Sequence, residues 1–158
     1  MDEISISALS QAHQSLRELM VRHQLAYLSG DLGQARERFL DLVDALEHHA
    51  QEEDGRLLPL YRERARPSPG GDWRNFTGEH EKIRLSLAAI GRMIGDLSKS
   101  EEPRRAVLAV LDLEARLKDL LEHHFKREET FLFPELDRLM DDDEKRKLLS
   151  GTLTLKFT

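Results

Sequence analysis

Two segments of the chain repeat one pattern of histidines and carboxylates. The first, HHAQEEDGRLLP, starts at residue 48, and the second, HHFKREETFLFP, starts at residue 123. They align without a gap. Each contains, in order, a histidine pair, a glutamate, an acidic residue directly after it, a hydrophobic pair and a proline. Imidazole and carboxylate groups together bind iron, manganese or zinc. The repeat therefore predicts one shared metal site supplied by both segments.

Helical geometry selects one histidine and one glutamate of each segment for the protein interior. An α-helix turns about 100° per residue, so side chains four residues apart lie on one face. His124 and Glu128 then share a face with the apolar Leu117. His49 and Glu53 lie on an apolar face in the same way. We expect both His-x-x-x-Glu units to point into the core.

Three other histidines are not predicted to be metal ligands. His48 and His123 lie among charged residues on their helices, so we expect both at the surface. His23 lies in a sector with Leu16 and Leu19, at the edge of an apolar face. We expect it to be a packed or boundary histidine rather than a metal ligand.

Two further long apolar segments each contribute one inward histidine, His13 and His80. Either residue alone is as well explained by a hydrogen-bonded core histidine. In combination with the repeated units they place two carboxylates and four imidazoles in one core, and burying unpaired carboxylates costs several kcal/mol each. A pair of metal ions would offset this cost. The predicted ligands are His13, His49, Glu53, His80, His124 and Glu128.

Helical periodicity runs along most of the chain and predicts an all-α fold. The predicted helices cover about residues 4–28, 32–65, 76–97 and 103–140, and a short helix or tail covers about 141–158. We expect breaks near Gly55, Pro59 and Pro134. Short connections between long helices favour an up-down-up-down four-helix bundle.

Length and composition exclude several other classes of protein. A chain of 158 residues predicts a single domain. It has no cysteine and a net charge of −6 with both signs interspersed, which argues against disulfides, thiolate metal sites and a nucleic-acid surface. No signal peptide or membrane span is visible, so we expect a cytoplasmic protein that binds neither membranes nor nucleic acid. The sequence indicates no particular protein partner.

At these residues the chain resembles the hemerythrin-like, or HHE cation-binding, domain family over about residues 8–140. The resemblance rests on the order of the six predicted ligands and on the segment HHFKREETFLFP. It implies a non-haem di-iron centre inside the bundle. Glu53 and Glu128 would bridge the two iron ions, the four inward histidines would supply nitrogen ligands, and an oxo or hydroxo group from solvent would complete the centre.

The chain departs from the oxygen-carrying members of the resembled family at two places. Those proteins have a second histidine one turn after the third-helix histidine, where this chain has Arg84, and a longer His-to-Asp spacing on the fourth helix, where it has His124 and Glu128. One imidazole ligand is therefore missing, and one more coordination position stays open unless Tyr27 or His23 fills it. More open coordination favours reaction over reversible binding.

Three functions follow from this interpretation. The first is a di-iron protein that binds or reacts with O₂ or related small oxidants, in oxygen or redox sensing, iron handling, or defence against peroxide or nitric oxide. The second is a di-iron enzyme that degrades peroxide as catalases do. The third is a helical interaction module with a structural metal or none.

Overall fold

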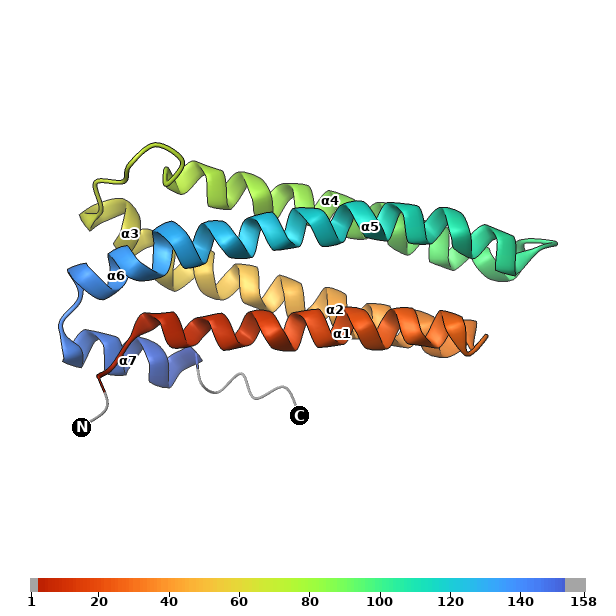
Figure 1. Cartoon of the computed structure of the whole chain (residues 1–158), viewed down its shortest axis with the longest axis horizontal. Coiled ribbons are helices and arrows are strands. Elements are labelled where there is room, and N and C mark those ends of the chain that lie inside the picture. The colour runs from red at the N-terminus through yellow and green to blue at the C-terminus, as the bar shows by residue number, and fades with distance from the viewer. Residues whose placement is uncertain (1–2, 153–158) are drawn as a thin grey trace.

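The computed structural model describes residues 3–152 and is built around four long antiparallel helices (Figure 1). These helices are α1 (Gln11–Leu28), α2 (Leu32–Glu52), α4 (Trp73–Asp96) and α5 (Pro103–Arg127). Figure 1 shows α1 beside α2 and α4 beside α5, with α3, α6 and α7 at one end of the bundle. The described residues contain no strand. The predicted all-α, up-down-up-down bundle is confirmed.

Shorter helical segments extend this frame, all but one of them at the end of the bundle where α1 begins; the exception, Leu97–Lys99, lies in the connection between α4 and α5. In chain order the shorter segments are η1 (Ile6–Ser10), η2 (Glu53–Leu57), α3 (Leu58–Arg64), η3 (Leu97–Lys99), η4 (Glu128–Leu132), α6 (Phe133–Leu139) and α7 (Asp142–Thr152). The predicted extension at 141–158 is thus helical up to residue 152, and residues 153–158 lie outside the described part of the chain. Among residues 3–152, no helix is both long and apolar enough to cross a bilayer.

Local sequence explains where the long helices begin and end. The side chains of Asp31 and Asp72 accept hydrogen bonds from the first-turn N–H groups of α2 and α4, which cap these helices. Gly30, with a φ of 78°, makes the turn between α1 and α2, because this backbone conformation favours glycine. Pro103 stands in the first turn of α5, where no N–H partner is needed.

The breaks predicted near Gly55, Pro59 and Pro134 occur as two π-helical turns, η2 and η4. Each turn starts at a glutamate of the repeat. The N–H of Leu58 donates to the Glu53 carbonyl, five residues earlier, and the N–H after η4 bonds the Glu128 carbonyl in the same way. Proline lacks the N–H that an α-helix would need one turn further on, so the wider turn accommodates it.

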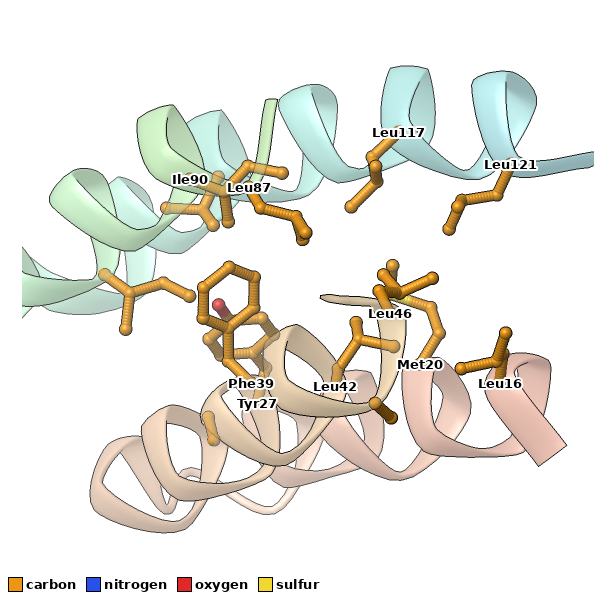
Figure 2. Packing of buried hydrophobic residues seen from close by; sticks show 14 of the residues in the cluster. Leu16, Met20, Tyr27, Phe39, Leu42, Leu46, Leu87, Ile90, Leu117 and Leu121 are labelled. Carbon is orange, nitrogen blue, oxygen red and sulfur yellow. The ribbon is translucent and has the colours of Figure 1, made fainter. Parts of the chain in front are cut away.

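The apolar core has two parts, one on each side of a polar layer. The larger cluster includes Leu42, Ile90 and Leu117 between the four long helices, as Figure 2 shows. The smaller cluster joins η1, α3, α6 and α7 and includes Ile6 and Phe133. Along each long helix the predicted ligands fall between these two clusters, so apolar side chains close the polar layer from both ends of the bundle.

The N-terminal segment is fastened to α6 by one carboxylate. Asp137 accepts a hydrogen bond of 2.6 Å from the Ser5 hydroxyl and another of 2.6 Å from the Ile6 N–H. Lys145 of α7 lies 3.6 Å from the same carboxylate. Partial burial raises the pKa of Asp137, but these hydrogen bonds outweigh it and hold the pKa below its usual value. Asp137 therefore joins η1, α6 and α7.

We expect Asp137→Ala to lower the free energy of unfolding by about 1–2 kcal/mol at neutral pH, because it leaves two donors without their charged acceptor. A carboxylate with a lowered pKa stabilises the folded state above its ordinary pKa, and this contribution is lost as the pH falls through the folded-state value. Urea unfolding at neutral and at acidic pH should therefore show the gap between wild type and variant narrowing in acid. Asp112→Ala, at an exposed position of α5, is the control and should leave the stability nearly unchanged. A gap of equal size at both pH values would contradict this account.

Candidate metal centre

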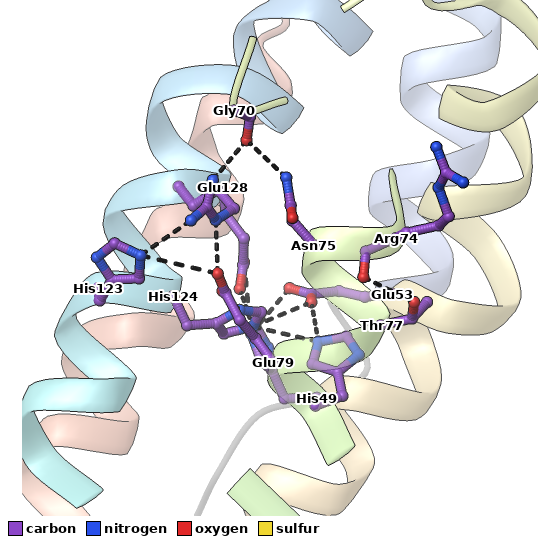
Figure 3. Close-up of polar contacts among 12 residues, drawn as sticks. His49, Glu53, Gly70, Arg74, Asn75, Thr77, Glu79, His123, His124 and Glu128 are labelled. Atoms are coloured by element: carbon purple, nitrogen blue, oxygen red, sulfur yellow. Dashed lines mark hydrogen bonds and ion pairs between the residues drawn. The ribbon is translucent and has the colours of Figure 1, made fainter. Parts of the chain in front are cut away.

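The six residues predicted as ligands converge on one layer inside the bundle. His13 comes from α1, His80 from α4, and each of the two repeated segments supplies one histidine and one glutamate. Five of the six side chains are at most 2% exposed, and His49 is 12% exposed. In Figure 3 the side chains of His49, Glu53, His124 and Glu128 point toward one another.

The cluster consists of two groups that share both glutamates. One group contains His13 and His49, and the other contains His80 and His124; Glu53 and Glu128 belong to each. Within a group, one ligand atom from every residue lies within 4.8 Å of the others. Two sites that share two carboxylates are the arrangement that a pair of bridged metal ions requires.

The imidazole Nε2 atoms face the shared carboxylates. His13 Nε2 lies 3.0 Å from Glu128 Oε2, and His80 Nε2 lies 2.9 Å from Glu53 Oε2. His124 Nε2 lies 2.5 Å from Glu128 Oε1. The Nε2 atoms of His80 and His124 are only 3.2 Å apart. One nitrogen of each ring is thus aimed at the centre of the cluster.

Three buried polar atoms of the cluster lack a hydrogen bond, although each lies close to other carboxylate or imidazole atoms of the cluster. They are His49 Nε2, Glu53 Oε1 and Glu128 Oε1, and no other buried side-chain nitrogen or oxygen within residues 3–152 is in this state. His49 Nε2 and Glu53 Oε1 are 2.9 Å apart but are not aligned for a hydrogen bond. Buried polar atoms normally have partners. The donor set, two carboxylates and four imidazoles, therefore fits metal ions in this layer.

A second layer of carboxylates orients three of the four imidazoles. Glu129 lies 2.7 Å from His13 Nδ1, and Asp54 lies 2.8 Å from His80 Nδ1. These two acids directly follow the two shared glutamates, so each repeated segment supplies both a candidate ligand and a carboxylate for an imidazole on another helix. The sequence contained this signal in the acidic residue after each glutamate. A carboxylate at Nδ1 fixes the tautomer that leaves Nε2 free for a metal.

Glu79 orients His124 in the same way, and no pattern in the sequence had indicated this role. Its Oε2 lies 2.7 Å from His124 Nδ1, and its Oε1 lies 2.5 Å from Arg127 Nε. Arg127 also donates to the Gly70 carbonyl, which connects the loop after α3 to the cluster (Figure 3). Glu79 is adjacent to the predicted ligand His80 on α4, but only the packing of α4 against α5 shows which imidazole it contacts.

The repeat extends beyond the two segments found from the sequence. His13 and Arg17 on α1 recur in the same spacing as His80 and Arg84 on α4. The pair α1–α2 and the pair α4–α5 are thus similar halves, and each half places its histidine against the glutamate of the other. The two halves are therefore related by an approximate twofold axis, and their ligands are arranged similarly on both sides of the cluster although the two sequences differ.

Each of these arginines forms an ion pair with a glutamate of the opposite half. Arg17 Nε lies 2.6 Å from Glu122, and Arg84 Nε lies 2.9 Å from Glu47. Both glutamates stand two residues before the inward histidine of their helix. Arg84 is therefore held toward the surface by Glu47 and is not part of the cluster.

The charges of the cluster stabilise one another in the absence of a metal. Burial alone lowers the pKa of His49, but Glu53 and Glu128 outweigh it and raise this pKa to about 10. Burial likewise opposes the charge of His124, yet Glu128 and its neighbours hold the pKa well above its usual value. Burial raises the pKa of Glu53, but His49 and the surrounding donors bring it well below its usual value. Metal ions would have to displace protons from these imidazoles.

The other histidines lie outside the cluster. His48 and His123 are exposed, as predicted. His23 is completely buried, so of the two predicted environments, packed or boundary, it has the packed one. Its Nδ1 lies 2.7 Å from the Ala35 carbonyl oxygen, and its Nε2 contacts Glu114, a buried carboxylate that the sequence did not single out. Glu114 draws this imidazole fully into the core.

Tyr27 is engaged by the same buried carboxylate. Its hydroxyl donates to Glu114 Oε1 over 3.4 Å. Neither Tyr27 nor His23 belongs to the two groups of candidate ligands. The hypothesis that one of them fills a spare coordination position therefore finds no support in the structure.

Comparison with known families agrees with this geometry. The sequence profile described as Hemerythrin HHE cation binding domain matches residues 4–111 and 71–152, which together cover nearly the whole chain. The chain belongs to the hemerythrin HHE cation-binding domain family. Comparisons with curated proteins and with solved structures gave no match.

Metal affinity should depend steeply on pH, because the imidazoles to be deprotonated have raised pKa values. With Zn²⁺ as a probe, we expect the apparent affinity to rise by about tenfold or more per pH unit between about pH 6 and pH 8, since at least one proton is displaced per metal. The rise should end above the His49 pKa of about 10. Competition with a chromophoric chelator measures the affinity. An affinity that does not change with pH would contradict the proposed ligand set.

Glu129→Ala should weaken metal binding without removing a candidate ligand. Loss of the carboxylate at His13 Nδ1 frees this imidazole to rotate, and such losses typically cost 10- to 100-fold in affinity. His48→Ala, at an exposed position on α2, is the matched control and should bind as wild type does. Equal affinities for both variants in the same chelator competition would show that Glu129 has no orienting role.

Proposed function

We propose that this chain is a non-haem di-iron protein that binds or reacts with O₂ or related small oxidants. The observation that carries the proposal is the pair of ligand groups that share Glu53 and Glu128. A mixed set of imidazoles and carboxylates suits iron, although manganese and zinc accept the same ligands. When bound, two iron ions would supply the electrons and the open coordination positions that O₂ requires.

The roles of the residues follow from the two groups. His13 and His49 would hold one ion, His80 and His124 would hold the other, and the two glutamates would contact both. With four imidazoles and two carboxylates, the ligand set leaves coordination positions for an exogenous small molecule. This supports reaction with an oxidant more strongly than it supports a purely structural metal, whose site is usually closed.

The surroundings of the cluster favour controlled redox chemistry. Phe125 stacks on the His13 ring at 4.1 Å, and Phe133 lies 5.8 Å from the same ring. These rings and the two apolar clusters exclude bulk water, which would otherwise compete for the open positions. Glu129, Asp54 and Glu79 keep the imidazoles oriented while a ligand enters or leaves.

The interaction module without metal explains the cluster less well. Glu53 and Glu128 lie close together in space, and each is no more than 2% exposed. A fold that needed only packing would not bury two carboxylates in this way. Their burial is unfavourable unless cations pair with them. The imidazoles balance these charges when they are protonated, but Glu53 Oε1 and Glu128 Oε1 still lack a hydrogen bond, and we therefore infer that metal binding, rather than packing, accounts for these two residues.

Mixing O₂ with the reduced protein tests this function directly. Protein loaded anaerobically with ferrous iron should develop ferric absorbance near the ultraviolet edge on mixing with air-saturated buffer. Glu53→Ala and Glu128→Ala remove the shared carboxylates, so each should slow or abolish this change, whereas His123→Ala, at an exposed position, should not. Stopped-flow spectroscopy with iron analysis of every sample makes the measurement. Retention of ferrous iron without any reaction with O₂ would overturn the proposal.

A further inference from the structure

A small cavity reaches candidate ligands of the metal centre, whereas a larger surface hollow on the other half, beside Arg17 and Glu129, is lined by none of them. The small cavity lies between α2, α4 and α5, and the imidazoles of His49, His80 and His124 form its inner wall. Its volume is about 10 Å³, which is room for about one water molecule. A ligand of two or three atoms is therefore the largest that fits there without movement of the protein.

The outer wall of this cavity is an ion pair. Glu47 and Arg84 are the lining residues with substantial exposure, 38% and 33%, while the others are buried or nearly so. Arg84 Nε lies 2.9 Å from one Glu47 oxygen and Arg84 Nη2 lies 3.2 Å from the other, so the pair is bidentate. Arg84 also donates to Glu81 over 2.7 Å, and because both side chains of the pair are partly exposed, water competes for the contact between them.

Comparison of the two halves of the chain explains why the cavity is on this side. The equivalent pair, Arg17 and Glu122, covers the other half of the cluster. Under it the repeat places Phe125, whose ring stacks on His13 and lies 5.3 Å from the Arg17 guanidinium. The residue that matches Phe125 in the first segment is Ala50, which lines the cavity. A methyl group in place of a phenyl ring leaves the space open.

We propose that the Glu47–Arg84 pair is the gate through which ligands of two or three atoms reach the candidate metal centre, and that Ala50 keeps the passage behind it open. The inference rests on the proposed di-iron function and adds the route of entry and the limit on ligand size. Larger molecules do not fit without movement of the protein, because the cavity has room for about one water molecule. Neither Glu47 nor Arg84 contacts the shared carboxylates in the part of the chain that the structure describes, and Arg84 Nη2 lies 3.7 Å from Asp54, the carboxylate at His80 Nδ1.

The test compares Glu47→Gln with the matched variant Glu122→Gln. Each substitution weakens one Arg–Glu pair, but only the first pair lines a cavity that candidate ligands also line, because the hollow beside Arg17 is lined by none of them. The probe is nitric oxide, a neutral diatomic molecule whose approach a change in charge does not bias. We expect Glu47→Gln to raise its association rate with the reduced, iron-loaded protein about three- to fivefold, and Glu122→Gln to leave the rate unchanged.

Ala50→Leu tests the passage by closing it rather than opening it. A leucine side chain would fill the cavity, so we expect the nitric oxide association rate to fall about tenfold or more, with iron content and helicity retained. Should Ala50→Leu fold poorly, the two glutamine variants, which change only surface side chains, still decide the question.

The outcomes separate the two proposals. If wild type and variants take up iron, and Glu47→Gln and Glu122→Gln bind nitric oxide at equal rates, the gate is wrong while the di-iron function stands. If wild type takes up no iron, the di-iron function is wrong and the gate falls with it. A faster Glu47→Gln beside an unchanged Glu122→Gln supports the gate.

Discussion

The burial of two neighbouring carboxylates is the constraint on which the rest of this structure depends. Glu53 and Glu128 lie at the centre of the bundle, where like charges repel and water cannot screen them. Four imidazoles face them, and three of those imidazoles are held from behind by Asp54, Glu79 and Glu129. Without a metal, protons on the imidazoles supply the balancing charge; with metal ions bound, the ions would supply it. The stability of the layer is thereby linked to what binds in it.

The internal repeat shows how one chain builds this layer. Each half contributes a helix with an inward histidine and a helix that ends in a π turn at a glutamate, Glu53 or Glu128. The proline that follows each turn is incompatible with a regular α-helix, so the irregular turn is encoded next to the residue that it positions. The halves differ at the position that follows the inward histidine, which is Ala50 in the first half and Phe125 in the second. Ala50 lines a cavity that reaches three candidate ligands, whereas Phe125 fills the corresponding space against His13.

Much of this arrangement could be predicted from the sequence because it follows from helical period alone. The spacing of His124 and Glu128, and of His49 and Glu53, places each pair on one face whatever the tertiary structure. Contacts between helices could not be predicted in this way. Glu79 orients an imidazole on α5, and Glu114 draws His23 into the core, through packing that no single helix reveals. The π turns were visible only as expected breaks, since proline signals an interruption but not its hydrogen-bond pattern.

The central claim is that the buried layer holds a pair of iron ions. It is tested most directly by the iron content of protein purified in air, together with its ultraviolet–visible spectrum before and after dithionite. The account predicts about two iron ions per chain, one for each ligand group, and a ferric band near the ultraviolet edge that bleaches on reduction. Protein that contains no metal, and takes none up when ferrous iron is added anaerobically, would contradict it.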